Sequence, residues 1–286
     1  MSALFGPAGN SDSFAKMGYK SNLDAPEYVS KMELDIYEYQ CGRGVRVSEN
    51  NAKVYKENAE KFGIKTSLHA PYFISLSSVE EEKRLKSVDY ILQSAKAADM
   101  LGADRIIVHS GSCSKITREE ALSLAKDTLK IARNALLENG LSHIHICPET
   151  MGKINQLGTL EEVLELCLVD ESFIPCIDFG HLNARTFGGM NTKEDFENAL
   201  NMVENKLGID KLKFFHSHFS KIEYTENGGE KKHLTFEDEI YGPNFEPLAE
   251  LIAKKNLSPC FICESAGTQA EDALFMKKAY KDYKNK

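Results

Sequence analysis

Short apolar runs alternate with longer amphipathic stretches along the whole chain. The run Arg105–His109 (Arg-Ile-Ile-Val-His) is brief, apolar at its centre and bounded by polar residues, which is typical of a buried strand. The stretch 79–101 before it has apolar residues every three or four positions and stops at Gly102, so it predicts a helix with one buried face. Strands and helices are therefore expected to alternate.

The same unit occurs eight times without a linker or a change of composition. The predicted strands are residues 2–5, 34–39, 65–69, 105–109, 143–149, 174–178, 211–216 and 259–264. The predicted helices open at residue 24 and then cover 50–62, 79–101, 117–138, 159–168, 192–204, 245–255 and 268–283. This order predicts an α/β fold, a single (β/α)8 TIM barrel domain over residues 1–286, with any site at the carboxyl ends of the strands. An open doubly wound sheet would need a Gly-x-Gly-x-x-Gly turn, which the sequence lacks.

Composition narrows the classes of function. A chain of 286 residues fits such a barrel, and a net charge of -8 means that nucleic acid can bind only at a local basic patch. Seven cysteines, most of them inside apolar runs, and an N-terminus without a signal pattern indicate reduced thiols in a cytoplasmic protein. No apolar run approaches the roughly 18 residues of a membrane span, so we expect no membrane partner.

Potential metal ligands stand where the predicted strands end. The run Ile174–Asp178 stops on a carboxylate and is followed three residues later by His181, and a turn at Gly180 would let both side chains converge. Alone, this pair could equally be a capped strand end. The last six predicted strands, however, end in His69, His109, Glu149, Asp178, His216 and Glu264. These side chains would crowd one face of the barrel and repel one another unless a cation neutralised the carboxylates, which predicts a metal centre.

The number of donors predicts more than one ion. A catalytic zinc needs only three or four protein ligands, whereas His181 and His233 extend the candidate set to eight residues. Two ions can share a bridging carboxylate. Such a pair suits hydrolysis of a phosphodiester, because it provides a hydroxide at neutral pH and neutralises charge on the phosphate and the leaving oxygen.

The segments that carry these donors resemble the zinc-dependent endonuclease IV family of apurinic/apyrimidinic DNA endonucleases, within the xylose-isomerase-like TIM barrel superfamily. The resemblance covers nearly the whole chain. The matching segments are His69-Ala-Pro-Tyr-Phe-Ile-Ser-Leu, Val108-His109-Ser-Gly, Pro148-Glu149-Thr, Cys176-Ile-Asp-Phe-Gly-His181 and Ile262-Cys-Glu264.

This resemblance implies a role for each candidate ligand. The first zinc would be bound by His69, His109 and Glu149. Glu149 would bridge to a second zinc, whose other ligands would be Asp178, His216 and Glu264. The family's third zinc takes a histidine that corresponds to His181 and an Asp-x-His pair whose histidine corresponds to His233. Manganese is an alternative to zinc for such nitrogen and oxygen donors.

The third motif departs from the family pattern. The family reads His-x-Asn-Asp-Ser-Lys and then Asp-Arg-His, where this chain has His216-Ser-His-Phe-Ser-Lys221 and then Lys231-Lys-His233. A protonated lysine in place of the aspartate cannot ligate an ion and would repel it. A third ion would therefore need a carboxylate from elsewhere in the loop, for which the candidates are Glu230, Glu237, Asp238 and Glu239.

The first functional hypothesis is hydrolysis of DNA at abasic sites, as in DNA repair. Glu149 and Glu264 would be the catalytic residues that hold the metals and orient the nucleophile. Tyr72 could stack where a base is missing. Phosphate contacts are expected from basic residues in the strand-helix loops, namely Arg43, Arg46, Lys115, Lys153, Arg185 and Lys221. We expect a monomer and predict no protein partner.

A sugar isomerase or epimerase is the alternative within the same superfamily. Enzymes of that kind resemble this chain at Glu149, Asp178, His216 and Glu264, which can hold one divalent metal between two carboxylates that exchange a proton. The altered third motif favours this alternative, whereas His69 and His109 favour the nuclease, because a one-metal epimerase does not need them as ligands. A metal-binding protein with another substrate is a third possibility. The number of bound ions distinguishes the first two hypotheses.

Overall fold

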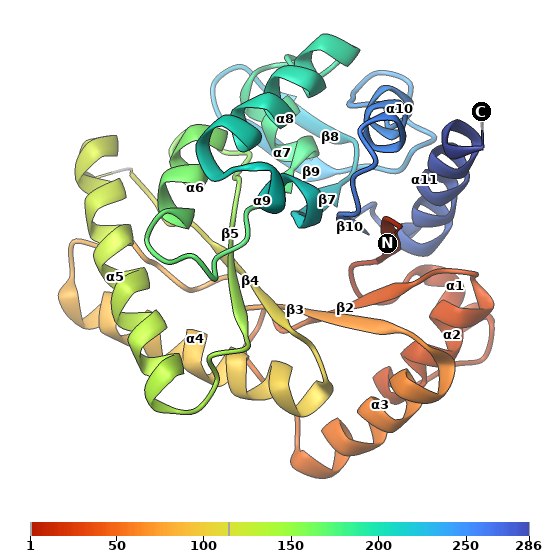
Figure 1. Ribbon diagram of the computed structural model, residues 1–286, viewed down its shortest axis with the longest axis horizontal. Helices are drawn as coiled ribbons and strands as arrows, with labels where there is room; N and C mark the ends of the chain where they lie inside the picture. The colour runs from red at the N-terminus through yellow and green to blue at the C-terminus, as the bar shows by residue number, and fades with distance from the viewer. Residues whose placement is uncertain (1, 114, 286) are drawn as a thin grey trace.

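The computed structural model describes residues 2–113 and 115–285. Eight parallel strands form one sheet in the order β1-β10-β7-β6-β5-β4-β3-β2, with helices around it (Figure 1). These strands are β1 (Leu4–Pro7), β2 (Ile36–Gln40), β3 (Lys65–His69), β4 (Arg105–His109), β5 (His145–Glu149), β6 (Cys176–Asp178), β7 (His216–Phe219) and β10 (Cys260–Cys263). The fold is the predicted (β/α)8 TIM barrel.

The first two strands close the sheet into a barrel. β1 and β2 stand at the two ends of the strand order, and a parallel bridge joins Ala8 to Glu38. The amide of Gly9 also donates to the carbonyl oxygen of Glu38 at 3.0 Å. A side chain at Gly6 would prevent this closure, because a Cβ there would lie 1.7 Å from the carbonyl oxygen of Ile36.

Helices cover the outside of the barrel, and their ends follow local sequence signals. Thr159 and Glu162 form the capping box that the sequence predicts, and Gly63 and Gly102 end two helices with φ of 69° and 76°. The helices are α1 (Asp12–Lys16), α2 (Ala25–Lys31), α3 (Glu49–Phe62), α4 (Glu81–Leu101), α5 (Arg118–Glu138), α6 (Leu160–Cys167), α7 (Phe179–Arg185), α8 (Lys193–Leu207), α9 (Ile209–Phe214), α10 (Glu246–Lys254) and α11 (Gln269–Lys284). Within the described residues, none of them has the length and apolar character that a membrane crossing requires.

The predicted strand at residues 211–216 is wrong. Residues 209–214 form the short helix α9, and β7 begins at His216 instead of ending there. A short run in which lysine alternates with apolar residues fits one turn of helix as well as a strand, so the pattern alone did not decide between them. The shift has a consequence for the site: the histidine in the carboxyl half of β7 is His218.

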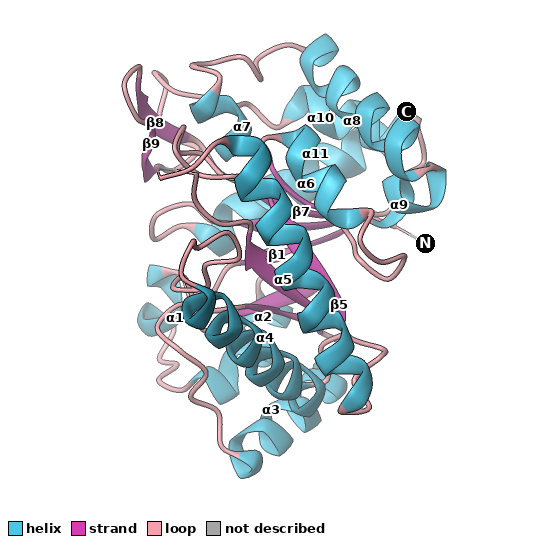
Figure 2. Ribbon diagram, turned by 90° about the vertical axis from the view of Figure 1, so that its left-hand side faces the viewer, coloured by secondary structure: helices cyan, strands magenta, loops and turns pink. Residues whose placement is uncertain are grey.

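A helix after β6 and a hairpin after β7 were not predicted. The helix α7 follows Asp178 directly, where a turn at Gly180 was expected. The insertion 221–241 contains an antiparallel hairpin, β8 (Ile222–Thr225) and β9 (Gly229–His233). Figure 2 shows this hairpin at one end of the molecule, with α9 and the N-terminus toward the other. Because it follows the carboxyl end of β7, the hairpin lies on the face where the sequence places the site.

Candidate metal centre

Glu149, the last residue of β5, lies among histidines from three other strands. It is only 1% exposed. Its Oε2 lies 3.5 Å from His69 Nε2 and 3.4 Å from His109 Nε2. Its Oε1 lies 2.9 Å from His218 Nδ1. The two oxygens of one carboxylate thus face two different groups of histidine nitrogens, which is the arrangement that a bridging ligand requires.

The first donor group consists of Glu149 with His69 and His109, and His69 and Glu149 also have ligand atoms within 4.8 Å of His218. Glu149 Oε2 is buried and accepts no hydrogen bond. Two ligands placed about 2.0–2.1 Å from a tetrahedral zinc lie about 3.3 Å apart, close to the distances between this oxygen and the two histidines. His69 Nδ1 lies 2.8 Å from the Ala70 carbonyl oxygen, and a bond there leaves Nε2 as the ligating nitrogen.

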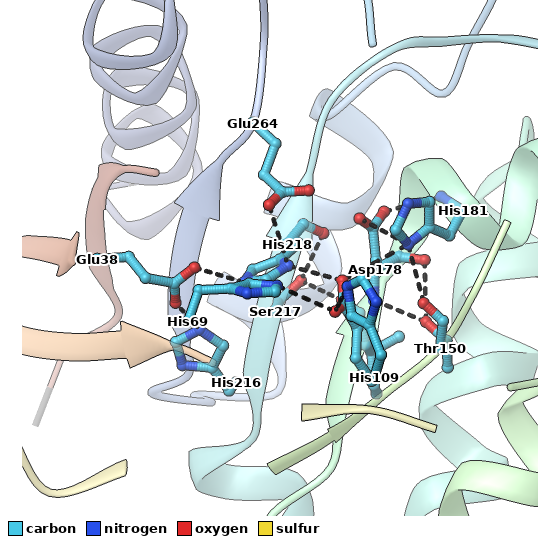
Figure 3. Close-up of polar contacts among 12 residues, drawn as sticks. Glu38, His69, His109, Thr150, Asp178, His181, His216, Ser217, His218 and Glu264 are labelled. Atoms are coloured by element: carbon cyan, nitrogen blue, oxygen red, sulfur yellow. Dashed lines mark hydrogen bonds and ion pairs between the residues drawn. The ribbon is translucent and has the colours of Figure 1, made fainter. Parts of the chain in front are cut away.

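The second donor group consists of Glu149, Asp178, His218 and Glu264, whose ligand atoms all lie within 4.8 Å of one another. Figure 3 shows Asp178 and Glu264 on different sides of the His218 ring. Asp178 Oδ1 accepts from the His181 amide at 2.8 Å and so caps α7, whereas Oδ2 is buried without a hydrogen bond. One oxygen of Asp178 therefore caps α7, and the metal-ligand role of the other oxygen stays a prediction.

His216 lies away from this group. Its Nε2 lies 3.0 Å from Oε2 of Glu38, a buried residue of β2, and it shares a deeper group of donors with Cys176 and His218. Residues two apart on a strand face the same side, so His218 occupies the position that the sequence analysis assigned to His216. The displacement follows from the position of β7, which begins at His216, the residue where the predicted strand was expected to end.

The third donor group consists of His181, Glu230 and His233. His181 Nδ1 lies 2.9 Å from the Thr150 carbonyl oxygen, and its Nε2 lies 3.4 Å from Glu230 Oε2. His233 Nε2 lies 4.0 Å from Glu230 Oε1. Glu230 is thus the loop carboxylate that stands where the expected aspartate is missing.

Lys231 does not enter this third group, because its ammonium pairs with Glu223 on β8. Backbone hydrogen bonds instead fasten the hairpin to the loop after β5: the Glu230 amide donates to the Gly152 carbonyl oxygen at 3.1 Å. Gly152 permits this contact, since a Cβ there would lie 2.6 Å from Glu230 Cβ and 2.9 Å from His181 Cδ2. The third group therefore depends on close packing at Gly152.

The substitution Gly152→Ala is expected to remove the third ion selectively. The added methyl would push Glu230 away from His181, while the donors around Glu149 would keep their places. Metal analysis after dialysis should show one ion fewer per chain than in the wild type. Gly228→Ala in the same hairpin is the control, because its methyl would meet nothing closer than 3.4 Å. Equal ion content in Gly152→Ala and the wild type would contradict this assignment.

The buried carboxylates of the site need positive charge beside them. Burial opposes charging of His181, but Asp178, Glu230 and other carboxylates raise its pKa to about 9. His218 is likewise buried, and its anionic surroundings raise its pKa well above the ordinary value. By contrast, burial lowers the pKa of His109 to about 3, so its ring is neutral and able to ligate. Without an ion, protons on His181 and His218 balance the carboxylates, and they would leave when a metal binds.

A cavity of about 370 Å³ opens above these groups. Tyr72 lines it and is 56% exposed, with its ring stacked on His109 at a centroid distance of 5.4 Å. Arg43 and Arg46 are exposed in the loop after β2, where Gly42 O accepts from the Tyr72 amide.

Lys221, by contrast, is only 9% exposed. Its Nζ donates to the carbonyl oxygens of Phe236 and Asp238, so its ammonium holds the loop after β9. Among the basic residues expected at the phosphate, Arg43 and Arg46 are exposed, and Lys153 lines the wall of the cavity.

Sequence reasoning missed two residues of the site, His218 and Glu38. His216 and His218 are two apart, and their shared strand face was a signal that either could be the donor. For Glu38, the alternation of apolar and acidic residues over 34–39 was visible in the sequence. That alternation gave no indication of which face of the strand points into the barrel. Glu230 was among the four acidic residues considered for the third group.

Fold and donors together define a class: a metal-binding TIM barrel with its candidate site at the carboxyl ends of the strands. The chain belongs to the xylose isomerase-like TIM barrel family, whose model matches residues 26–279. It is 32% identical over 274 residues to an uncharacterized protein of Methanocaldococcus jannaschii, with 96% of each chain covered. It is 29% identical over 180 residues to a probable endonuclease 4 of Aquifex aeolicus, with 62% of each chain covered.

Solved structures show the same fold. A D-tagatose 3-epimerase-like protein superposes with a TM-score of 0.73 at 20% identity, covering 99% of this chain and 98% of the other. Endonuclease IV from Thermus thermophilus superposes with a TM-score of 0.68 at 17% identity, covering 98% of both chains. At these identities the superpositions establish the fold and leave the choice of activity to the site. The family match and the donor groups mark the chain as an enzyme of this superfamily.

Proposed function

We propose that this chain is a zinc-dependent phosphodiester hydrolase that resembles endonuclease IV and cleaves DNA at abasic sites. One observation carries the proposal: Glu149 joins two groups of donors, and His181 begins a third beside them. An epimerase that works with one ion has no need of His69 and His109 as ligands or of the group around Glu230. Sequence similarity to probable endonuclease 4 proteins supports the same choice.

The chemistry of hydrolysis suits this donor set. Bound divalent ions would supply a nucleophile at neutral pH and neutralise charge on the phosphate. Glu149 and Glu264 would hold the ions, and the carbonyl oxygens of Ala70 and Thr150 would fix the rings of His69 and His181. The stacked ring of Tyr72 at the mouth offers a surface for the gap left by a missing base.

The overall charge of -8 requires that DNA be bound locally. Two or three divalent ions would make the mouth of the cavity positive. Lys153, which lines the cavity, and the exposed Arg43 and Arg46 would extend that patch. We propose that the chain works in the cytoplasm as a monomer with three bound ions, zinc or manganese.

Purified protein loaded with zinc is expected to nick a duplex that carries one abasic site and to leave the intact duplex uncut. Cleavage should weaken steeply as salt rises, since phosphate contacts release counterions. Denaturing electrophoresis of an end-labelled duplex, with metal content measured on the same sample, provides the test.

The one-metal sugar epimerase remains the competing function, since Glu149, Asp178, His218 and Glu264 alone could hold one ion. The same preparation should therefore be incubated with ketohexoses. The nuclease proposal fails if the protein binds a single ion, interconverts a ketohexose and does not nick the abasic duplex with zinc or manganese.

A further inference from the structure

A carboxylate that belongs to none of the donor groups above lies beneath the centre. Glu38 extends from β2 into the barrel interior and is completely buried (Figure 3). Its Oε1 lies 3.0 Å from His218 Nε2 in an ion pair, and His218 Nδ1 faces Glu149 and Glu264 at 2.9 and 3.5 Å. The two nitrogens of this ring therefore face different carboxylates, one below the centre and the others within it.

The environment of Glu38 shows that it is not itself a free ligand. Gln40 Nε2 lies 3.2 Å from Oε1, while the Ser67 hydroxyl donates to Oε2 at 2.9 Å. His216 Nε2 lies 3.0 Å from the same Oε2. Glu38 thus makes three hydrogen bonds, with Gln40, Ser67 and His216, and its contact with His218 Nε2 is an ion pair without hydrogen-bond geometry. Glu38 is held by three strands, β2, β3 and β7, and cannot turn toward the ions without leaving these partners.

We propose that Glu38 is a positioning residue: it fixes the ring of His218 through Nε2, so that Nδ1 stays directed at the ion held by Glu149, Asp178 and Glu264. The inference rests on the metal centre of the proposed function. A metal-bound histidine commonly gives its other nitrogen to a carboxylate, which sets the tautomer and makes the ring a better ligand. His216 then braces Glu38 from the other side, which accounts for a second buried histidine in β7.

The variant Glu38→Gln tests this role, because it keeps the shape of the side chain and removes its charge. The amide nitrogen of the new side chain would present N–H groups, in place of an acceptor oxygen, to a histidine nitrogen. This change would weaken the contact that orients the His218 ring. We expect the affinity for one zinc per chain to fall about 10- to 100-fold, with the other zincs unchanged. Competition against a chromophoric chelator, with zinc alone as the probe, measures each affinity.

Two comparisons separate positioning from a general structural effect. Ser67→Ala also removes a partner of Glu38, but on the oxygen that does not face His218, so its zinc affinities should stay within about threefold of the wild type. In a His218→Ala background, Glu38→Gln should cause no further loss, since the ring through which it acts is gone. The proposal is overturned if Glu38→Gln leaves all affinities unchanged, or if it costs as much without His218 as with it.

If Glu38→Gln does not fold, as judged by circular dichroism of the metal-free protein, Glu38→Asp takes its place. Aspartate keeps the charge but withdraws it from His218 by about one methylene. The proposal is again overturned if all affinities stay unchanged, or if the loss is as large without His218 as with it. The measurement contains no DNA. A protein that fails to nick an abasic duplex but shows the expected zinc affinities would thus refute the nuclease proposal and leave the role of Glu38 standing.

Discussion

Replacing Glu149 by glutamine is expected to abolish activity, with a decrease in kcat of about a thousandfold or more. Glu149 contacts His69 and His109 through one oxygen and His218 through the other, so it is shared by the first two donor groups. Loss of its charge would release or displace both ions. Transition-state stabilisation of about 4 kcal/mol from the ions would be lost, and that corresponds to about a thousandfold in rate.

The measurement combines rate and metal content for Glu149→Gln, Glu149→Asp and a surface control, Glu161→Gln on α6. Aspartate retains the charge at a shorter reach and should retain part of both properties. The control should match the wild type, since Glu161 is exposed and belongs neither to the donor groups nor to the lining of the cavity above them. If Glu149→Gln kept two bound ions and most of its activity, Glu149 would not be the bridging ligand.

Removal of metal is expected to lower the thermal unfolding temperature by about 8 °C or more, besides abolishing activity. An ion present at about a thousand times its dissociation constant stabilises the folded chain by about 4 kcal/mol, and about 2 °C per kcal/mol is typical of a protein of this size. The physical source is the crowd of buried carboxylates, since Glu149 Oε2 and Asp178 Oδ2 have no hydrogen bond to replace an ion.

Calorimetry with excess zinc and with excess chelator measures this difference, and restoring zinc should restore the higher temperature. Glu149→Gln, which lacks the shared ligand, is the matched variant and should show a much smaller difference between the two conditions. If the wild type unfolded at the same temperature with zinc and with chelator, the donor groups would hold no ion tightly.

Much of this architecture could be predicted from the pattern of apolar residues. Eight strand-and-helix units imply a barrel, because parallel strands need helical connections and bury both faces. The same order implies that residues at successive strand ends meet. His69, His109, Glu149, Asp178 and Glu264 do lie together at one end of the barrel, with distances that only a shared edge of parallel strands explains. Direction and order of the strands were sufficient for this part of the site.

Other parts of the site depend on contacts between residues far apart in sequence, which local patterns do not contain. The run 211–216 was compatible with a helix or a strand, and only packing between β6 and β10 places β7 so that His218 enters the centre and His216 lies below it. The sequence offered four acidic residues, Glu230 among them, as candidates for the third donor group. Contact of the hairpin with Gly152 is what brings Glu230 to that group.

Glu38 shows the limit most clearly. Apolar and acidic residues alternate in residues 34–39, which predicts a strand with two different faces. In a closed barrel both faces are buried, so an acidic residue such as Glu38 no longer indicates which face is toward solvent. Sequence alone thus determined the barrel and the edge at which its donors gather. Tertiary structure decided which histidine of β7 faces Glu149, which loop carboxylate lies beside His181 and which way Glu38 points, because each of these depends on register and closure across strands distant in the chain.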